Sequence, residues 1–223
     1  MRLLEYQGKE LFQKYGIAVP TSALVEKPAA EISLQFPVVL KSQVLSGDRK
    51  KKRGIRIVEQ KEDYSDRLAE LFGREINGEL PQKILVEEKV NFTKEWYVSL
   101  SYDTDRRMPV LAVSEHGGAG IETAEVFPLE FTAGSWRLPQ KNFPLQMRHV
   151  LNALFELFQK EHALLTEINP LFELTDGSFI AGDAKIILDD NAKNPADRPY
   201  LNLPGDIAVL ASGGGASLLN LDI

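Results

Sequence analysis

Oxygen-bearing side chains occur on two neighbouring apolar segments towards the end of the chain. Glu167 and Asn169 lie in the segment 164–171, which reads LLTEINPL, and Asp183 follows the apolar pair at 179–180. Mg²⁺ takes oxygen ligands, usually only a few from protein side chains, with phosphates and water completing its shell. Asn169 and Asp183 are therefore candidate magnesium ligands. The spacing alone fits a hairpin with solvent-facing polar residues equally well.

A second set of candidates follows an apolar stretch at 37–40 that is typical of a buried strand. Lys41 ends this strand, and five cations occupy the consecutive positions 49–53. Placed over a polyphosphate, such cations would neutralise the transferring charge. Most charge runs are solvated surface, however, and the run by itself favours that interpretation.

Acids stand at the ends of two further predicted strands. Glu87 and Glu88 end one strand, and Glu95 begins the next. A carboxylate in such a place can accept hydrogen bonds from an adenine amino group or from ribose hydroxyls, while the strand end offers its backbone to the base edge. Ordinary solvent-facing acids are the alternative.

The apolar patterns predict a mixed set of elements that must position these side chains. Helical spacing occurs near the N-terminus and at 64–72 and 145–161, and strand patterns occur at 55–58, 84–87, 96–102, 110–113, 164–168 and 172–174. Helices and strands mix without strict alternation. The pattern therefore predicts an α+β fold of α/β layers rather than a doubly wound sheet.

The composition indicates a soluble globular protein. The chain has 223 residues, 43% of them hydrophobic, a net charge of −6 and no cysteine. The hydrophobic content argues against disorder, and the acidic balance argues against nucleic acid as the main partner. The missing thiols exclude disulfides and cysteine-based sites. Without an apolar run of about 20 residues or a signal-peptide core, we predict a cytoplasmic protein with no membrane partner.

The last part of the chain indicates a change of domain. Residues 187–206 are polar and contain three prolines, whereas an apolar strand at 207–211 runs into the glycine-rich loop 212–217. A strand followed by a glycine loop is typical of the start of a nucleotide- or CoA-binding α/β domain. We therefore predict a domain at 1–186, a linker at 187–206 and the truncated start of a second domain at 207–223. An edge strand docked on the first domain is the alternative.

Together these motifs resemble the ATP-grasp half of the β subunit of succinyl-CoA synthetase, and the corresponding part of ATP-citrate lyase and citryl-CoA synthetase. The resemblance rests on motifs at 5–12, 38–44, 84–87, 94–97, 117–118, 167–171 and 183–185. They follow the family's order and span nearly the whole chain. The resemblance implies an ATP-grasp fold of two lobes with the nucleotide between them, followed by a flavodoxin-like CoA-ligase domain.

The resemblance also implies a role for each matching residue. Nucleotide phosphates would contact Lys41, Asp48, Arg49 and Lys50. Adenine would contact Glu87 and the backbone near Val90, and Glu95 would hold the ribose or phosphates. Asn169 and Asp183 would hold Mg²⁺. Such a domain supplies positioning and charge neutralisation, which phosphoryl transfer mainly demands. No catalytic residue is implied within the chain, because the phosphorylated histidine of this family belongs to the partner.

Two features depart from the family pattern. Succinyl-type relatives carry a Gly-Gly-Arg-Gly-Lys loop, whereas residues 47–51 read Gly-Asp-Arg-Lys-Lys, which restricts close approach of the backbone to phosphate. The string at 212–217 resembles the citrate lyase branch, but the opening motif resembles the succinyl branch. The acid substrate therefore stays open between succinate, citrate and another acid.

The resemblance thus predicts the ATP-binding portion of an acyl-CoA synthetase or ATP-citrate lyase. With Mg²⁺ and ATP, or GTP as an alternative, it would phosphorylate a histidine of a CoA-binding partner subunit or domain. The partner would then ligate a small carboxylic acid to CoA within a hetero-oligomer. Two alternatives are another ATP-grasp carboxylate ligase that acts through an acyl phosphate, and a degenerate grasp domain that only scaffolds a partner.

Overall fold

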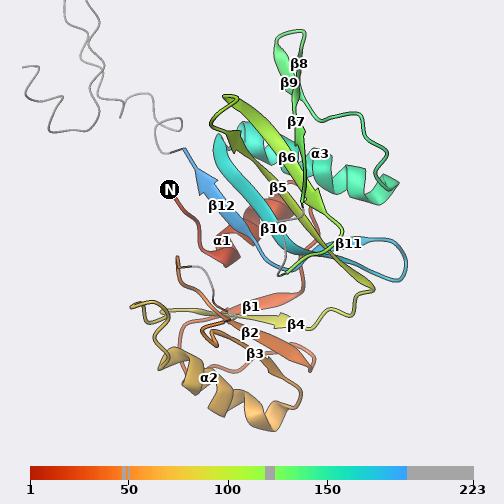
Figure 1. Cartoon of the computed structure of the whole chain (residues 1–223). Helices are drawn as coiled ribbons and strands as arrows, with labels where there is room; N and C mark the ends of the chain where they lie inside the picture. The colour runs from red at the N-terminus through yellow and green to blue at the C-terminus, as the bar shows by residue number, and fades with distance from the viewer. Residues whose placement is uncertain (47–48, 50, 119–123, 190–223) are drawn as a thin grey trace, which may run out of the picture. The chain divides into compact units, whose positions relative to one another are not determined.

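A computed structural model describes residues 1–46, 49, 51–118 and 124–189, and these residues form an α+β fold, as predicted (Figure 1). The helices are α1 (Glu5–Lys14), α2 (Tyr64–Phe72) and α3 (Leu145–Lys160), with a 3₁₀ turn η1 (Lys61–Asp63) before α2. The small sheet contains β1 (Ser22–Val25), β2 (Val38–Ser42), β3 (Ile55–Val58) and β4 (Ile84–Glu88). The large sheet contains β5 (Lys94–Asp103), β6 (Met108–Ser114), β7 (Glu125–Pro128), β10 (Ala163–Glu173), β11 (Phe179–Ala181) and β12 (Lys185–Leu188). A separate hairpin consists of β8 (Glu130–Thr132) and β9 (Ser135–Arg137).

The small sheet has one apolar face and one face that carries charge. Its strands are antiparallel in the order β1-β4-β2-β3. Leu40 and Val86 belong to a buried apolar cluster that also contains Leu68 of α2, so this helix covers one face (Figure 1). Because successive side chains of a strand point to opposite faces, Lys41 and Glu87 lie on the face away from α2.

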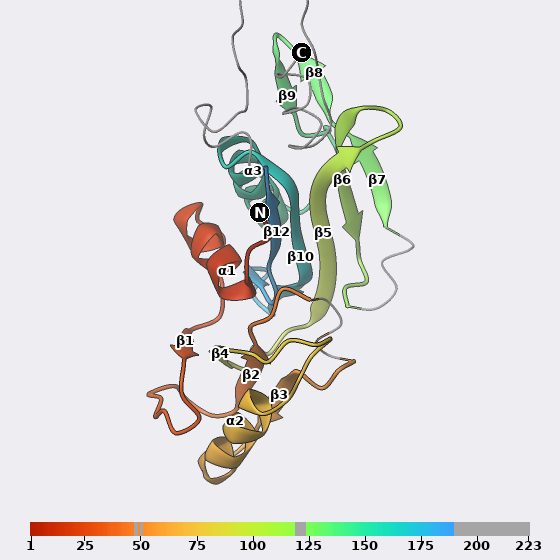
Figure 2. The same ribbon diagram turned by 90° about the vertical axis from the view of Figure 1, so that its left-hand side faces the viewer.

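The large sheet is covered on one face by α1 and α3, as Figure 2 shows. Its strands are antiparallel in the order β11-β10-β5-β6-β7, and β12 also pairs with β10. Phe12 of α1, Leu154 of α3 and Val98 of β5 are fully buried members of one apolar cluster. This cluster fixes α1 against the sheet, and α1 carries two further charged residues that matter below.

β10 is irregular at its midpoint, where the candidate magnesium ligands lie. The sequence predicts two strands at 164–168 and 172–174, but the structure has one continuous strand whose register against β5 shifts between Ile168 and Leu171. Pro170 has no N–H to donate to the ladder, so regular pairing fails there. β12 and β11 pair with the two halves of β10, and Asp183 lies in the connection between them.

The predicted domain boundary stays a prediction. β12 ends at Leu188, so the first residues of the predicted linker at 187–206 belong to this strand. Residues 190–206 of that linker, the predicted second-domain start at 207–223, and the loop residues Asp48 and Lys50 lie outside the described residues. Among the described helices, none is both long and apolar enough to cross a membrane.

Candidate functional site

Six charged side chains meet where α1, β2, β4, the loop after β2 and the β11–β12 connection come together. We call them the junction cluster: Lys9, Lys41, Arg49, Glu5, Glu87 and Asp183. Their formal charges cancel, which matters because isolated charges are costly to bury. Five of the six side chains are almost fully buried, and Asp183 is the most accessible at 33%.

Glu5 is the acid at the centre of the cluster. One of its oxygens lies 2.9 Å from the Lys41 ammonium and 3.0 Å from the Lys9 ammonium, and the other accepts a 2.6 Å hydrogen bond from Arg49. Burial by itself would raise the pKa of Glu5, but Arg49, Lys41 and Lys9 together hold that pKa well below its ordinary value. Glu5 is therefore ionised at neutral pH and holds three cations around it.

Glu87 and a backbone carbonyl complete the surroundings of the two lysines. Glu87 pairs with Lys41 at 2.6 Å and with Lys9 through its other oxygen. Both ammonium groups also donate to the carbonyl oxygen of Gly182, Lys41 at 2.5 Å and Lys9 at 2.9 Å. Burial would lower the pKa of Lys41, but Glu5 and Glu87 raise it, so this lysine stays charged.

Arg49 joins the loop after β2 to Asp183 through one guanidinium nitrogen, Nη2, which contacts both carboxylate oxygens. Its guanidinium donates to the two oxygens of Asp183 at 2.9 and 3.0 Å, and Asp183 also accepts the Ala184 N–H at 2.7 Å. Removal from bulk water and the negative charge of Glu5 raise the pKa of Asp183, although Arg49 opposes this shift. Arg49, which is predicted to contact phosphate, and Asp183, which is predicted to hold the metal ion, thus form an ion pair with each other in this structure.

A second polar group lies beside the irregular midpoint of β10. The Asn169 amide oxygen accepts the Gly118 N–H at 2.6 Å, and its amide nitrogen donates to the Gly118 carbonyl at 3.2 Å. The neighbouring Gly117 N–H donates to the Glu95 carbonyl at 2.9 Å. This group connects Asn169 with the start of β5, where Glu95 lies.

A backbone hydrogen bond joins the second group to the junction cluster. The Gly182 N–H donates to the carbonyl of Pro170 at 2.8 Å, which ties the connection before Asp183 to the residue after Asn169. Val90 lies half-buried on the β4–β5 connection, and no role for it follows from these contacts. The structure therefore places four of the described candidates in one cluster and two in the group beside it.

The side-chain oxygens of Asn169, at the irregular midpoint of β10, and of Asp183, in the β11–β12 connection, are ligand types that fit magnesium. Asp183 offers a carboxylate and Asn169 an amide oxygen, which are ligand types that Mg²⁺ accepts, and phosphates and water normally supply the other positions. Both oxygens accept hydrogen bonds here, from Arg49 and from Gly118. A bound cation would take the place of these donors.

Comparison with known proteins identifies the family. Residues 2–130 match the ATP-grasp domain family. The whole chain is 37% identical to the β subunit of the ADP-forming succinate–CoA ligase of Methanocaldococcus jannaschii and 32% identical to that of the GDP-forming ligase of Thermus thermophilus. It covers 71% and 70% of those two subunits. The chain belongs to the ATP-grasp family of succinate–CoA ligase β subunits.

The fold of this ATP-grasp chain also matches a solved structure of another acid–CoA enzyme. ATP citrate lyase from Methanothrix soehngenii, solved in complex with citrate and coenzyme A, aligns with a TM-score of 0.64 and 21% identity. The match covers 95% of this chain and 57% of that one. The predicted ATP-grasp fold is therefore confirmed.

Two cluster members of the ATP-grasp chain have no role in the sequence-based prediction. Glu5 and Lys9 belong to the opening motif, but their contacts with β2, β4 and the β11–β12 connection join distant parts of the chain. One signal in the sequence does point to them. They are spaced i, i+4, on the same helical face as the buried Phe12, so both charges face the interior.

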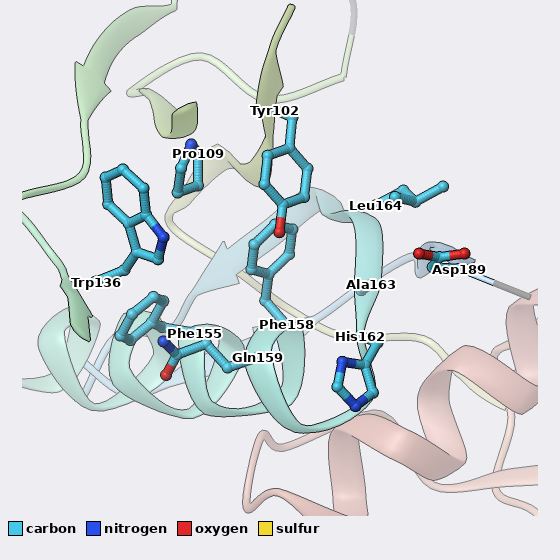
Figure 3. Close-up of a pocket in the computed structure, with 10 residues that line it drawn as sticks. All are labelled: Tyr102, Pro109, Trp136, Phe155, Phe158, Gln159, His162, Ala163, Leu164 and Asp189. Atoms are coloured by element: carbon cyan, nitrogen blue, oxygen red, sulfur yellow. The ribbon is translucent and has the colours of Figure 1, made fainter. Parts of the chain in front are cut away.

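A hollow at the far end of β10 is separate from these groups. Figure 3 shows this pocket of about 340 Å³, where aromatic rings such as Tyr102, Trp136 and Phe158 surround a space beside His162. Ala163, which begins β10, lines it, whereas Asn169 lies six residues further on, or roughly 20 Å along a strand. None of the described candidate residues lines this hollow.

Proposed function

We propose that this chain is the nucleotide-binding part of an ATP-dependent acid–CoA ligase. The observation that carries the proposal is the meeting of Lys41, Arg49 and Asp183 in one buried cluster, although they are far apart in sequence. Cations that neutralise phosphate and an acid that holds a metal ion are what phosphoryl transfer requires. The match along the whole chain to succinate–CoA ligase β subunits supports the same function.

In this proposal Lys41 and Arg49 contact the nucleotide phosphates. Both cations are held by carboxylates in this structure, so phosphate oxygens would replace these partners rather than meet free charges. Arg49 is suited to this exchange because a guanidinium donates to carboxylate and phosphate oxygens alike. Asp48 and Lys50 stay predictions for the same loop.

Asn169 and Asp183 are the proposed magnesium ligands. When bound, Mg²⁺ would neutralise phosphate charge and fix the orientation of the phosphate groups. As Arg49 turns to the phosphates, the Asp183 carboxylate becomes available, so one rearrangement prepares both the cation and the acid. The existing ion pair keeps both side chains ordered until then.

The proposed base and ribose contacts lie at the start of β5 and on the β4–β5 connection. Glu95 lies next to the second polar group and is proposed to hold the ribose or phosphates. The Glu87 carboxylate pairs with two lysines, so adenine would be met chiefly by backbone of the β4–β5 connection near Val90. ATP is the proposed nucleotide, with GTP as the alternative.

The remaining chemistry is assigned to a partner. We propose that a CoA-binding partner subunit or domain carries the histidine that accepts the phosphoryl group, and that a small carboxylic acid is then joined to CoA in a cytoplasmic hetero-oligomer. The names of the relatives support this proposal, because they are β subunits of CoA ligases. Which acid is used stays open between succinate, citrate and others.

Isothermal titration of ATP, with and without Mg²⁺, tests the proposal on the parent chain and on Asp183→Ala. We expect Mg²⁺ to strengthen ATP binding to the parent and to have much less effect on the variant. Equal affinity in both proteins and both conditions would contradict the metal assignment. A complete lack of nucleotide binding by the parent would instead support the scaffold alternative.

A further inference from the structure

Lys9 is a buried cation of α1 that joins three separate parts of the chain. Its side chain is only 4% exposed. It lies 3.0 Å from Glu5 on the same helix, pairs with Glu87 of β4, and donates to the Gly182 carbonyl at 2.9 Å. A buried ammonium needs such partners, since an unpaired one is strongly unfavourable. Lys9 therefore connects the small sheet to the connection that carries Asp183.

Gly182, directly before Asp183, is held from several sides. Lys9 and Lys41 both donate to its carbonyl, and its own N–H donates to Pro170. A Cβ at this position would overlap the ring of Phe172, so a side chain has no room. The backbone before Asp183 thus has little freedom as long as its hydrogen bonds persist.

The residue after Asp183 is in close contact with α1 as well. A Cβ added to Gly8 would lie 2.9 Å from the Cβ of Ala184, which is closer than such atoms approach in proteins. The helix backbone therefore packs directly on the chain beside Asp183. Gly8 and Lys9, neighbours on α1, hold the residues on either side of this acid.

We propose that Lys9 is a positioning residue for metal–nucleotide binding, which acts by holding Gly182 and thereby the Asp183 carboxylate. This inference rests on the proposed function, in which Asp183 is a magnesium ligand. Lys9 itself contacts neither metal nor nucleotide in this proposal. Groups that orient a metal ligand from outside typically change metal affinity or activity by about 10- to 100-fold when they are replaced.

The test uses Lys9→Met, which removes the ammonium, and Lys9→Gln, which keeps a neutral donor. Lys14→Met is the matched control, because Lys14 lies on the same helix with its side chain 61% exposed. ATP affinity is measured by titration calorimetry with and without MgCl₂, and the ratio of the two affinities is the readout. We expect this ratio to fall about tenfold in Lys9→Met, less in Lys9→Gln and not at all in Lys14→Met.

A comparison in the Asp183→Ala background shows whether Lys9 acts through that acid. Adding Lys9→Met to Asp183→Ala should change the magnesium ratio no further, since coupled residues give non-additive effects. An additive second loss would overturn the inference, and so would an unchanged ratio in Lys9→Met. Loss of folding in both Lys9 variants, seen by circular dichroism, would show a purely structural lysine and would overturn it too. If the parent itself shows no magnesium effect, the proposed function fails first and the inference fails with it.

Discussion

Glu5 and Glu70 each bind three cations, but they do so in different surroundings. Glu70 of α2 accepts hydrogen bonds from Arg56 at 2.8 Å, Arg67 at 3.2 Å and Arg74 at 2.6 Å, and 29% of its side chain is exposed. The three cations around Glu5 lie at similar distances, yet only 1% of the Glu5 side chain is exposed. The same local chemistry thus occurs at the surface of the small sheet and in the interior of the junction cluster.

The two acids differ in where their partners come from: those of Glu70 are mostly local, whereas those of Glu5 join distant parts of the chain. Two partners of Glu70 come from α2 or its end, three and four residues away, so these pairs form with the helix. Two partners of Glu5 lie far away in the sequence. Lys41 is 36 residues away and also donates to the Gly182 carbonyl, and Arg49 is 44 residues away and also donates to Asp183. Buried ion pairs are weak contributors to net stability, because desolvation offsets their attraction. We therefore attribute the buried cluster to the arrangement of a binding site.

Replacement of Glu5 should have the largest effect on stability. Glu5→Gln removes one acid from a balanced buried cluster and leaves an excess positive charge, which typically costs about 3–5 kcal/mol. We expect the free energy of unfolding, measured in urea, to fall by about that amount. A loss below about 1 kcal/mol would mean that water or rearrangement compensates the cluster, and the contrast with Glu70 would disappear.

Replacement of Arg49 should change two binding constants in opposite directions. In Arg49→Gln the Asp183 carboxylate loses its guanidinium partner and becomes more accessible to a cation. We expect Mg²⁺ alone to bind more tightly, whereas ATP binding in the presence of Mg²⁺ weakens by roughly tenfold, because a charge-assisted contact to phosphate is lost. Calorimetry with MgCl₂ alone and with MgCl₂ plus ATP measures both. If both affinities fall together, Arg49 does not compete with the metal for Asp183.

The pH dependence of magnesium-dependent ATP binding should follow Asp183. Its pKa is raised above the ordinary 3.8, and a protonated carboxyl is a poor metal ligand. Affinity should therefore be fully present above the raised pKa and decrease as the pH falls through it, by up to about tenfold per unit below that point. Titrations in a series of acidic buffers measure this slope. Asp183→Asn should show no such slope, and persistence of the slope in that variant would assign it to another group.

The sequence predicts which residues belong to the candidate site better than it predicts which of them contact one another. Lys41 and Asp183 are found from their positions after apolar segments and from the family motifs, since these are local patterns. The pair between Arg49 and Asp183 joins residues 134 positions apart, and no periodicity reports such a contact. Short strands such as β1 and β7 also escape prediction, because their four residues depend on neighbouring strands rather than on a pattern of their own.

Replacement of Glu70 should have the smallest effect and completes the comparison. Hydrogen bonds from Arg56 and Arg74, the two largest influences, lower the pKa of Glu70 to about 2. The stabilisation from a lowered carboxyl pKa is present above the ordinary value near 4.5 and is lost as the pH falls towards 2. Because 29% of the Glu70 side chain is exposed and its arginine partners are partly solvated, we expect Glu70→Gln to cost no more than about 1 kcal/mol at neutral pH.

Salt separates this surface effect from the buried one. In about 1 M NaCl, where the Debye length falls to roughly 3 Å, the difference in unfolding free energy between Glu70→Gln and the parent should be smaller than at low salt. Urea denaturation at low and high salt measures it, with Glu5→Gln as the matched control. The cost of Glu5→Gln should remain, since ions do not enter the buried cluster. Equal salt sensitivity in the two variants would show that both acids are solvated alike and would remove the basis for treating the junction cluster as a site.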